Sequence, residues 1–503
     1  MTPLAAGQVT FTRIVNPPID YHAIAPELVL AGTIFVVLVV DLFLRRERKH
    51  LAMPVAFVGT AGALAAALTL IGDLPRRTFG GSYVIDNFAL LFKVFFLIVA
   101  LVILALSWRY LRDGRFYQGE YYVLVLSSFL GMLTMPSSRD LLMLFISLEL
   151  VSAPGFLLAG FRKGDPRSNE AALKFFLISV LATAVMLYGM SLIYGVTGTL
   201  RLDGIAAALA RPAGKTNLAL AAILFVVAGF AFKVSAFPFQ FWAPDTYEGS
   251  PVPVAAFLSV ASKAAGFAGL LQLMFVAFLA RADFWAPIFA VLSLFTMTIG
   301  NLVALQQQQV VRLLAYSSIA QAGYMLLPFA LATTNNPAIN KEAFSAAVLY
   351  ILIYAVMNLG AFAVVIAISR EAPGILVSDF AGLAQRAPPI AVAMAMFLIS
   401  LAGIPPLAGF WGKFFIFKAA IDRAGIGPWL AGAMVVNSVI SLVYYLSIVR
   451  PMFLEPAGEG LRPFRPPAPV MGVVALAAAV IVAVGIFPDL FVHFPRISTL
   501  IGR

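Results

Sequence analysis

Hydrophobic residues fill this chain in long runs that short polar segments separate. A run of about 20 residues is long enough for a helix to cross roughly 30 Å of hydrocarbon. About fourteen such runs follow one another between residues 25 and 491. The pattern predicts an all-α polytopic membrane protein with transmembrane helices at 25–44, 51–72, 87–108, 120–136, 140–161, 170–196, 217–248, 252–280, 284–305, 310–332, 343–369, 389–423, 427–454 and 469–491.

The polar segments between the runs are too short to house a soluble domain. The longest are residues 197–216, 370–388 and 455–468, and they have the length of surface connections. We therefore expect residues 1–503 to form a single transmembrane domain.

Two of the predicted helices carry prolines in the middle of the span. Pro238 and Pro244 interrupt the seventh, and Pro405 and Pro406 interrupt the twelfth. Proline lacks the N–H that the helix ladder uses, and lipid cannot satisfy the freed carbonyls, so each break needs a cavity lined by protein or filled with water. Interrupted helices in corresponding places are typical of transporters built from inverted repeats, whereas ordinary kinks for packing are the alternative.

Four charged residues lie inside predicted spans, where each costs about 2.5–3.5 kcal/mol at the centre of a helix. They are Glu149, Lys233, Lys263 and Lys413. Structural ion pairs or side chains that snorkel to the interface are the alternative, and snorkelling is expected for three lysines near helix ends: Lys93, Lys174 and Lys418. Lys263 is about ten residues from either end at 1.5 Å per residue, which is too deep. We interpret the four charges as functional.

The chemistry that buried lysines and a carboxylate support is proton handling. Burial in a medium of low dielectric destabilises an ammonium, and a nearby carboxylate stabilises it, so a carboxylate that moves can make a lysine hold or release its proton. Candidates to relay protons between such sites, with packing as the alternative for each, are Ser152, Ser235, Gln240, Tyr247, Ser262, Tyr316, Gln321, Tyr324 and Asn358.

Composition supports a membrane protein and excludes several other classes. The chain is 62% hydrophobic, and its net charge of +11 comes from basic residues in short loops, not from one continuous stripe that would bind nucleic acid. These loops alternate along the chain, so the positive-inside rule places the basic side in the cytoplasm and both termini outside. The absence of cysteine excludes thiolate iron–sulfur ligation and disulfides in this chain, and its 3 histidines are too scattered for a metal site.

Several stretches resemble the antiporter-like membrane subunits of the proton-pumping NADH:quinone oxidoreductase, respiratory complex I, and of the related cation/proton antiporters. They are "FKVSAFPFQFWAPDTYEGSPVPVAAFLSVASKAAG" at 232–266, "LISLAGIPPLAGFWGKFFIFKAA" at 398–420, "ISLELVSAPGFLLAG" at 146–160, "EAALKFFLISVLATAVMLYG" at 170–189 and "LLAYSSIAQAGYML" at 313–326. The resemblance implies two inverted five-helix repeats at about 120–280 and 284–454, with flanking helices at 25–108 and 469–491. It also implies proton-transfer roles for Glu149, Lys233, Lys263 and Lys413, and the role of a modulator for Lys174.

The same resemblance implies where the protein works and with what. It implies a bacterial inner membrane and neighbouring membrane-arm subunits, including another antiporter-like subunit and small membrane subunits. It implies no cofactor in this chain, because flavin, iron–sulfur clusters and quinone are handled by other subunits, and no nucleic acid. A subunit of a stand-alone multisubunit cation/proton antiporter and an inert structural spacer are the other two hypotheses.

Overall fold

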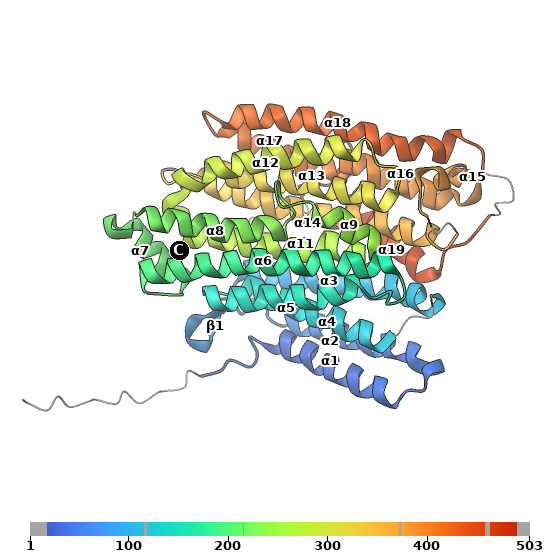
Figure 1. Cartoon of the computed structure of the whole chain (residues 1–503), viewed down its shortest axis with the longest axis horizontal. Helices are drawn as coiled ribbons and strands as arrows, with labels where there is room; N and C mark the ends of the chain where they lie inside the picture. The colour runs from blue at the N-terminus through green and yellow to red at the C-terminus, as the bar shows by residue number, and fades with distance from the viewer. Residues whose placement is uncertain (1–17, 115–117, 215, 372–373, 458–462, 490–503) are drawn as a thin grey trace, which may run out of the picture.

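The computed structural model describes residues 18–114, 118–214, 216–371, 374–457 and 463–489, and within them the chain is almost entirely helical. The helices lie side by side along the long axis of the molecule (Figure 1). In the first half of the chain they are α1 (Ala25–Phe43), α2 (Ala52–Leu68), α3 (Asn87–Asp113), α4 (Gln118–Thr134), α5 (Leu141–Ala159), α6 (Pro166–Thr197), α7 (Leu202–Ala210), α8 (Asn217–Lys233), α9 (Trp242–Gly249), α10 (Val252–Phe257) and α11 (Lys263–Gln272).

The second half of the chain continues the bundle. Its helices are α12 (Ala282–Ala304), α13 (Val310–Ala330), α14 (Pro337–Ile368), α15 (Leu383–Arg386), α16 (Pro388–Ala402), α17 (Ala408–Asp422), α18 (Gly427–Leu454) and α19 (Ala468–Ile486). The π-helical segment η5 (Leu258–Ser262) joins α10 to α11, and a second one, η6 (Leu273–Ala277), continues α11, so that together they form one long span.

The predicted spans correspond closely to these helices. Among the described residues, 11 helices are long and apolar enough to cross a membrane. The remaining three predicted spans correspond to α4 and to two pairs of shorter helices, α8 with α9 and α16 with α17. Both predicted interruptions are therefore present, while fourteen crossings remains a prediction.

The two ends of the bundle differ in their elements. At one end, which we call the basic face, Arg370 after α14 pairs with Asp113 at the end of α3, and the Gly382 amide before α15 donates to the Pro451 carbonyl of α18. The opposite face carries α7 and a hairpin of β1 (Arg76–Thr78) and β2 (Tyr83–Ile85). In Figure 1, α15 lies at the right end and α7 at the left.

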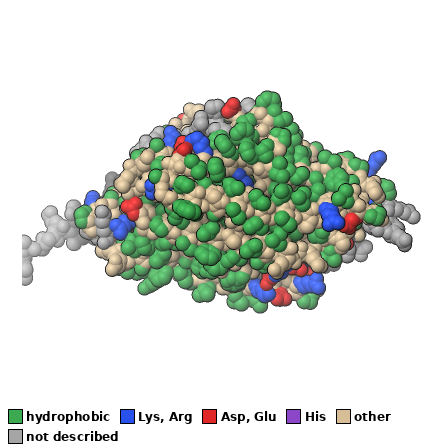
Figure 2. Space-filling view, turned by 90° about the horizontal axis from the view of Figure 1, so that it is seen from above, with side chains coloured by type: hydrophobic (Ala, Val, Ile, Leu, Met, Phe, Trp, Pro, Cys, Tyr) green, Lys and Arg blue, Asp and Glu red, His purple; other side chains and the backbone are tan. Residues whose placement is uncertain are grey.

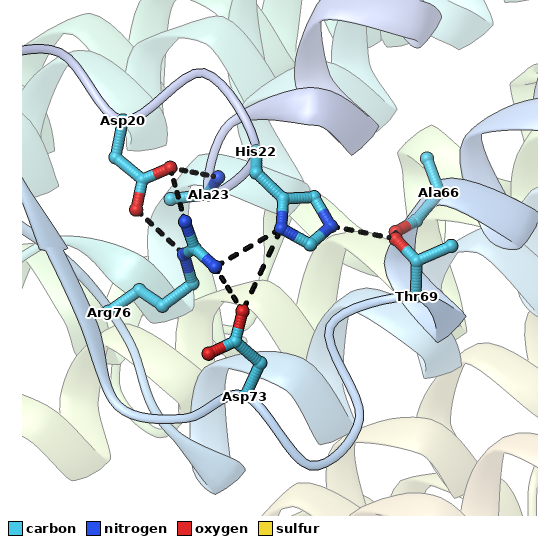
Figure 3. A network of polar contacts seen from close by, with 7 residues as sticks. All are labelled: Asp20, His22, Ala23, Ala66, Thr69, Asp73 and Arg76. Atoms are coloured by element: carbon cyan, nitrogen blue, oxygen red, sulfur yellow. Dashed lines mark hydrogen bonds and ion pairs between the residues drawn. The ribbon is translucent and has the colours of Figure 1, made fainter.

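A polar network at the start of α1 ties the chain to the loop before the hairpin (Figure 3). Arg76 donates to both carboxylate oxygens of Asp20, from Nε at 2.7 Å and from Nη2 at 2.8 Å, and it also binds Asp73. His22 Nε2 contacts Thr69 Oγ1 at 3.0 Å, and Thr69 in turn donates to the Ala66 carbonyl. The network fixes the entry of α1 against the end of α2.

The helices in the middle of the bundle are surrounded by the others. The span 252–277 is buried except at Val276, α13 and α14 are mostly buried, and most residues of α1, α2, α6 and α18 are at least partly exposed. Hydrophobic side chains cover most of the face shown in Figure 2, with Lys, Arg, Asp and Glu in a few scattered groups. This surface is suited to lipid or to apolar neighbours.

Three features differ from the sequence-based expectations. The connection at 197–216 contains α7, the connection before α3 contains the β1–β2 hairpin, and the eighth span contains π-helical turns. Short strands and π turns leave no clear hydrophobic period in a sequence, so pattern reading missed them. The two termini, predicted on the outer side, lie outside the described residues at 1–17 and 490–503.

Candidate functional site

The break in the seventh span begins directly after Lys233, the last residue of α8. Ser235 adopts φ +60°, a left-handed conformation that is uncommon for serine, and the chain resumes as α9 at Trp242. The indole Nε1 of Trp242 donates to the Phe232 carbonyl at 3.1 Å. Protein groups thus satisfy a carbonyl that the break frees, as a break at membrane depth requires.

Lys233 lies close to Glu149 without forming an ion pair with it. Its ammonium donates to Ser152 Oγ at 2.8 Å, and Ser152 follows Glu149 by one turn on α5. Glu149 accepts a hydrogen bond from Thr183 of α6 at 3.0 Å and acts on Lys233 only through its field. The buried lysine and the half-buried carboxylate therefore influence each other, but each forms its printed hydrogen bond with a different hydroxyl, Ser152 and Thr183.

The break in the twelfth span is formed at Gly403, which ends α16 with φ +92°. The positive φ favours glycine at this position, and a Cβ there would lie 2.8 Å from Lys413 Cδ, so any other residue would also displace the lysine. Lys413, 7% exposed, comes from α17 and donates to the Ala402 carbonyl at 3.0 Å and to Ser438 Oγ at 3.1 Å. Its ammonium also lies 4.4 Å from the ring centroid of Tyr324, a cation–π distance.

The two breaks place their lysines on opposite sides. Lys233 ends the helix before its break, whereas Lys413 belongs to the helix after its break. A cavity of 390 Å³ adjoins Lys413, and its lining is apolar except for Lys413 and Ser438. The two sequence motifs thus both mark a break in the middle of a span, but they place their lysines on different sides of the break.

Lys263 lies between the two breaks and is 2% exposed. Its ammonium donates to Ser318 of α13, to the carbonyl at 2.9 Å and to Oγ at 2.5 Å. The π-helical segment η5 ends directly before it, and such segments are frequent at functional sites. Lys233, Lys263 and Lys413 have this in common: within the described chain, each binds hydroxyl or carbonyl oxygens and none forms an ion pair with a carboxylate.

Hydroxyl and amide groups extend from Lys263 toward Lys413. Ser317, next to Ser318, contacts Tyr445 of α18 at 2.5 Å. Gln321 donates to the Tyr445 hydroxyl at 3.2 Å and accepts from Tyr350 of α14. The Tyr350 ring packs edge-on against Tyr324, which in turn faces Lys413. Hydrogen bonds join Ser317, Tyr445, Gln321 and Tyr350, and this polar cluster lies between Ser318 beside Lys263 and Tyr324 beside Lys413.

The other predicted relay residues divide into two groups. Asn358 donates to Ser259 Oγ at 2.8 Å, and Tyr316 lies near the surface with its ring 6.0 Å from Arg312. The buried side-chain oxygens without a hydrogen-bond partner in the described chain include those of Ser235, Gln240 and Tyr247. Tyr445, Ser317 and Tyr350 were not among the sequence candidates, although a hydroxyl inside an apolar run is the signal that would have found them.

Lys174 forms part of an ion-pair network at the basic face. It pairs with Asp245 of α9 at 2.9 Å, and Arg312 of α13 binds the other oxygen of Asp245 at 2.8 Å and Glu248 at 2.9 Å. The network links α6 and α13 to α9, the second half of the broken span. Lys418 likewise pairs near a helix end, with Glu342 and Asp422.

The expectation that Lys93 snorkels to the interface is wrong. Lys93 is 0% exposed, forms an ion pair with Glu27 of α1, and donates to Tyr83 at 2.7 Å and to the Leu133 carbonyl at 2.9 Å. The three donors of the ammonium are all used. Sequence could not reveal this because Glu27 and Tyr83 come from separate elements that only the fold brings together.

Known proteins resemble the chain over nearly its whole length. Residues 138–441 match the family described as "NADH:quinone oxidoreductase/Mrp antiporter, TM". A protein of Trichlorobacter lovleyi named NADH-quinone oxidoreductase subunit N is 40% identical, over 95% of this chain and 96% of the relative. Its counterpart in Streptomyces griseus, subunit N 2, is 43% identical over 95% and 94%.

Solved structures agree with this likeness. A chain of respiratory complex I from Thermus thermophilus superposes with a TM-score of 0.76 at 33% identity, over 93% of this chain and 98% of that one. A chain of the Mrp complex from Dietzia sp. superposes with a TM-score of 0.83 at 22% identity, over 95% and 97%, which shows the shared fold alone. The chain thus belongs to the antiporter-like membrane subunits of NADH:quinone oxidoreductase, in the group named subunit N.

Proposed function

We propose that this chain is a proton-translocating membrane subunit of a respiratory NADH:quinone oxidoreductase, and that it moves protons through Glu149, Lys233, Lys263 and Lys413, driven by redox events in other subunits. The observation that carries the proposal is the state of the three buried amines. Each is bound by neutral oxygens, so each can lose its proton without leaving a buried carboxylate unpaired.

The contacts support the following proposed order of proton movements. Lys233 holds a proton while the Glu149 carboxylate is near, and a shift of Glu149 away from it makes the ammonium a better donor. Lys263, as a neutral amine, accepts this proton through intervening hydroxyls or water. Lys413 accepts it next, through the series from Ser318 to Tyr324. Each transfer regenerates a neutral amine behind the moving proton.

Lys174 is proposed as a modulator of this path. It binds the second half of the broken seventh span through Asp245 and does not reach the buried amines. A change in this surface network therefore alters the position of α9 relative to Lys233, and it alters transfer without adding a proton-carrying site.

The arrangement in the membrane completes the proposal. The basic face lies in the cytoplasm of a bacterial cell, and both termini lie on the outer side, as the positive-inside rule indicates. Two inverted repeats at about 120–280 and 284–454 each contribute one broken span. Flavin, iron–sulfur clusters and quinone belong to other subunits, and the exposed apolar sides of α6 and α18 fit neighbouring membrane-arm subunits.

A cation/proton antiporter subunit is the alternative that a specific observation favours, because the Mrp chain shares the fold. Copurification separates the two proposals. Recovery of this chain with flavin and iron–sulfur proteins supports the oxidoreductase, and recovery with small membrane proteins alone supports the antiporter.

Proton pumping by the assembled complex in vesicles tests the assignment of residues. We expect Lys233→Ala and Glu149→Gln to assemble and to lose most of their NADH-driven proton uptake. The controls Lys163→Ala and Glu120→Gln change the same residue types at an exposed ion pair and should leave pumping unchanged. Full pumping by both site variants with normal assembly would remove Lys233 and Glu149 from the path.

A further inference from the structure

A second polar site lies at the basic face, far from the buried lysines in the fold, at the first turns of α16 and α19. A cavity of 430 Å³ opens there between the segment before α16 and the segment before α19. Its lining combines two arginines, Arg386 and Arg465, with apolar side chains that include Ile390, Phe464 and Met471. No acidic side chain of the described chain lines it.

Arg386 is the unusual member of this site. Among the described residues it is the only arginine that is buried, with 6% of its surface exposed. Its Nε and Nη2 atoms are buried and have no hydrogen-bond partner in the described chain. Within the described chain, its guanidinium carbon lies 5.2 Å from the ring centroid of Phe464, and a ring face does not accept the in-plane N–H bonds of a guanidinium.

Other arginines of the chain show what Arg386 lacks. Carboxylates bind each of the following: Arg76, Arg139, Arg201, Arg312 and Arg370. A guanidinium stays charged under all physiological conditions, so Arg386 cannot relieve its burial by losing a proton, as a lysine can. A buried charge without a partner is strongly unfavourable. An anion from outside the chain would compensate the charge of Arg386.

We propose that this cavity binds the phosphate group of an anionic membrane phospholipid, held by Arg386 and Arg465. The planar guanidinium matches the geometry of phosphate oxygens. The apolar walls fit the glycerol and the first methylenes of a lipid, whereas a free phosphate ion would make no favourable contact with them. Basic pockets between transmembrane helices at one membrane surface are a known form of headgroup site.

The place of the cavity in the fold favours the lipid over a soluble anion. It lies where two membrane helices begin, at the level where headgroups lie. Further along, both helices expose apolar side chains, among them Val392 on α16 (58% exposed) and Leu476 on α19 (57% exposed), so acyl chains find a hydrophobic surface below the headgroup. Because α16 is the first half of the broken twelfth span, a bound lipid also steadies the helix that ends at Gly403.

Photolabelling tests the site on the protein purified with its accompanying subunits. The probe is phosphatidylglycerol with a photoreactive group near its headgroup, and labelling of the peptide that contains Phe464 and Met471 is measured by mass spectrometry. We expect Arg386→Gln to reduce labelling by about tenfold or more, because a hydrogen-bonded charge pair is lost. Arg450→Gln removes an exposed arginine at the end of α18 and should label like the wild type.

Two competition experiments identify the source of the phosphate. Unlabelled phosphatidylglycerol should suppress the label, and inorganic phosphate in excess should not. Suppression by inorganic phosphate, or equal labelling of wild type and Arg386→Gln, would overturn the proposal. Should Arg386→Gln fail to assemble, Arg465→Gln on the exposed wall of the cavity replaces it, and unchanged labelling of that variant contradicts the site equally. The outcome is independent of whether the chain carries protons.

Discussion

The ammonium of Lys233 binds Ser152 Oγ at 2.8 Å and not the carboxylate of Glu149, which precedes Ser152 by one turn on α5. The lysine and the carboxylate are thus bound to different hydroxyls, because Glu149 accepts its hydrogen bond from Thr183 of α6. Ser152 accepts a hydrogen bond from the ammonium and donates its own hydroxyl proton to the Leu148 carbonyl at 2.7 Å. It could pass a proton on only by releasing the proton that is engaged in this bond. We therefore interpret Ser152 as a residue that positions the Lys233 ammonium and not as a carrier of protons.

The first prediction concerns this hydroxyl. Ser152→Ala removes an acceptor for a buried ammonium, and a hydrogen bond to a charged group contributes about 1.5–3 kcal/mol. We expect the pumping rate of the assembled complex to fall roughly tenfold, and Ser152→Thr, which keeps the hydroxyl, to retain most of it. Equal rates for the alanine and threonine variants would show that the hydroxyl has no part in transfer.

The second prediction concerns the break in the twelfth span. Gly403→Ala places a methyl group against Lys413 and forces alanine into φ +92°, at a cost of about 1–3 kcal/mol. We expect lower thermal stability together with a loss of pumping, because the amine is displaced.

Gly432→Ala is the matched control for that change. Gly432 lies within α18, and a Cβ there has no atom within 4 Å, so the variant should be as stable as the wild type or slightly more stable. A Gly403→Ala complex that melts and pumps like Gly432→Ala would contradict the account of the break.

The third prediction concerns the buried pair of Glu27 and Lys93. Removing one partner leaves an uncompensated charge, which costs about 3–5 kcal/mol, whereas removing both costs little. We expect Lys93→Met and Glu27→Leu each to impair assembly, and the double variant to restore it. A double variant that assembles no better than either single one would show that the pair does not act as a unit.

The fourth prediction concerns the network in Figure 3. Its hydrogen bond from Arg76 lowers the pKa of Asp20 below the usual 3.8, so the stabilising contribution of the ionised carboxylate is present above that value and is lost as the pH falls through the lowered pKa. We expect hydrogen exchange of the Ala23 amide, which donates to Asp20, to show constant protection between about pH 5 and 8 after correction for the intrinsic rate.

Asp20→Asn should weaken that protection throughout the same pH range. Asp203→Asn, at another arginine pair on the same face of the bundle, should not change it. A loss of protection in the wild type already at about pH 5 would show that the carboxylate titrates higher than the contact with Arg76 allows.

Much of this architecture can be predicted from the sequence because membrane helices have a clear hydrophobic pattern. A long apolar run has one stable form in lipid, and prolines within it mark the breaks, so the hydrophobic pattern alone predicts the helices and both interruptions. The same logic singles out Glu149, Lys233, Lys263 and Lys413, since a charge in a span needs a reason. Their neighbours in space, such as Ser318 beside Lys263, depend on how separate helices pack.

Lys93 and Arg386 show where that logic ends. Both stand near predicted helix ends, where a charged side chain normally reaches water, so the sequence gives no reason to expect either to be buried. The fold buries both, one against a carboxylate and the other in a cavity without one. Burial near a helix end is set by tertiary packing, which a single hydrophobic pattern does not encode.

The most direct test of the central claim is the number of protons pumped per NADH oxidised by a complex carrying Lys263→Met, reconstituted in vesicles. Lys418→Met, the same change at a half-exposed lysine that pairs with Glu342 and Asp422, is the control. The proposed path predicts that Lys263→Met lowers the ratio or stops pumping while Lys418→Met keeps the wild-type value. An unchanged ratio in a fully assembled Lys263→Met complex would contradict a proton path through the buried lysines.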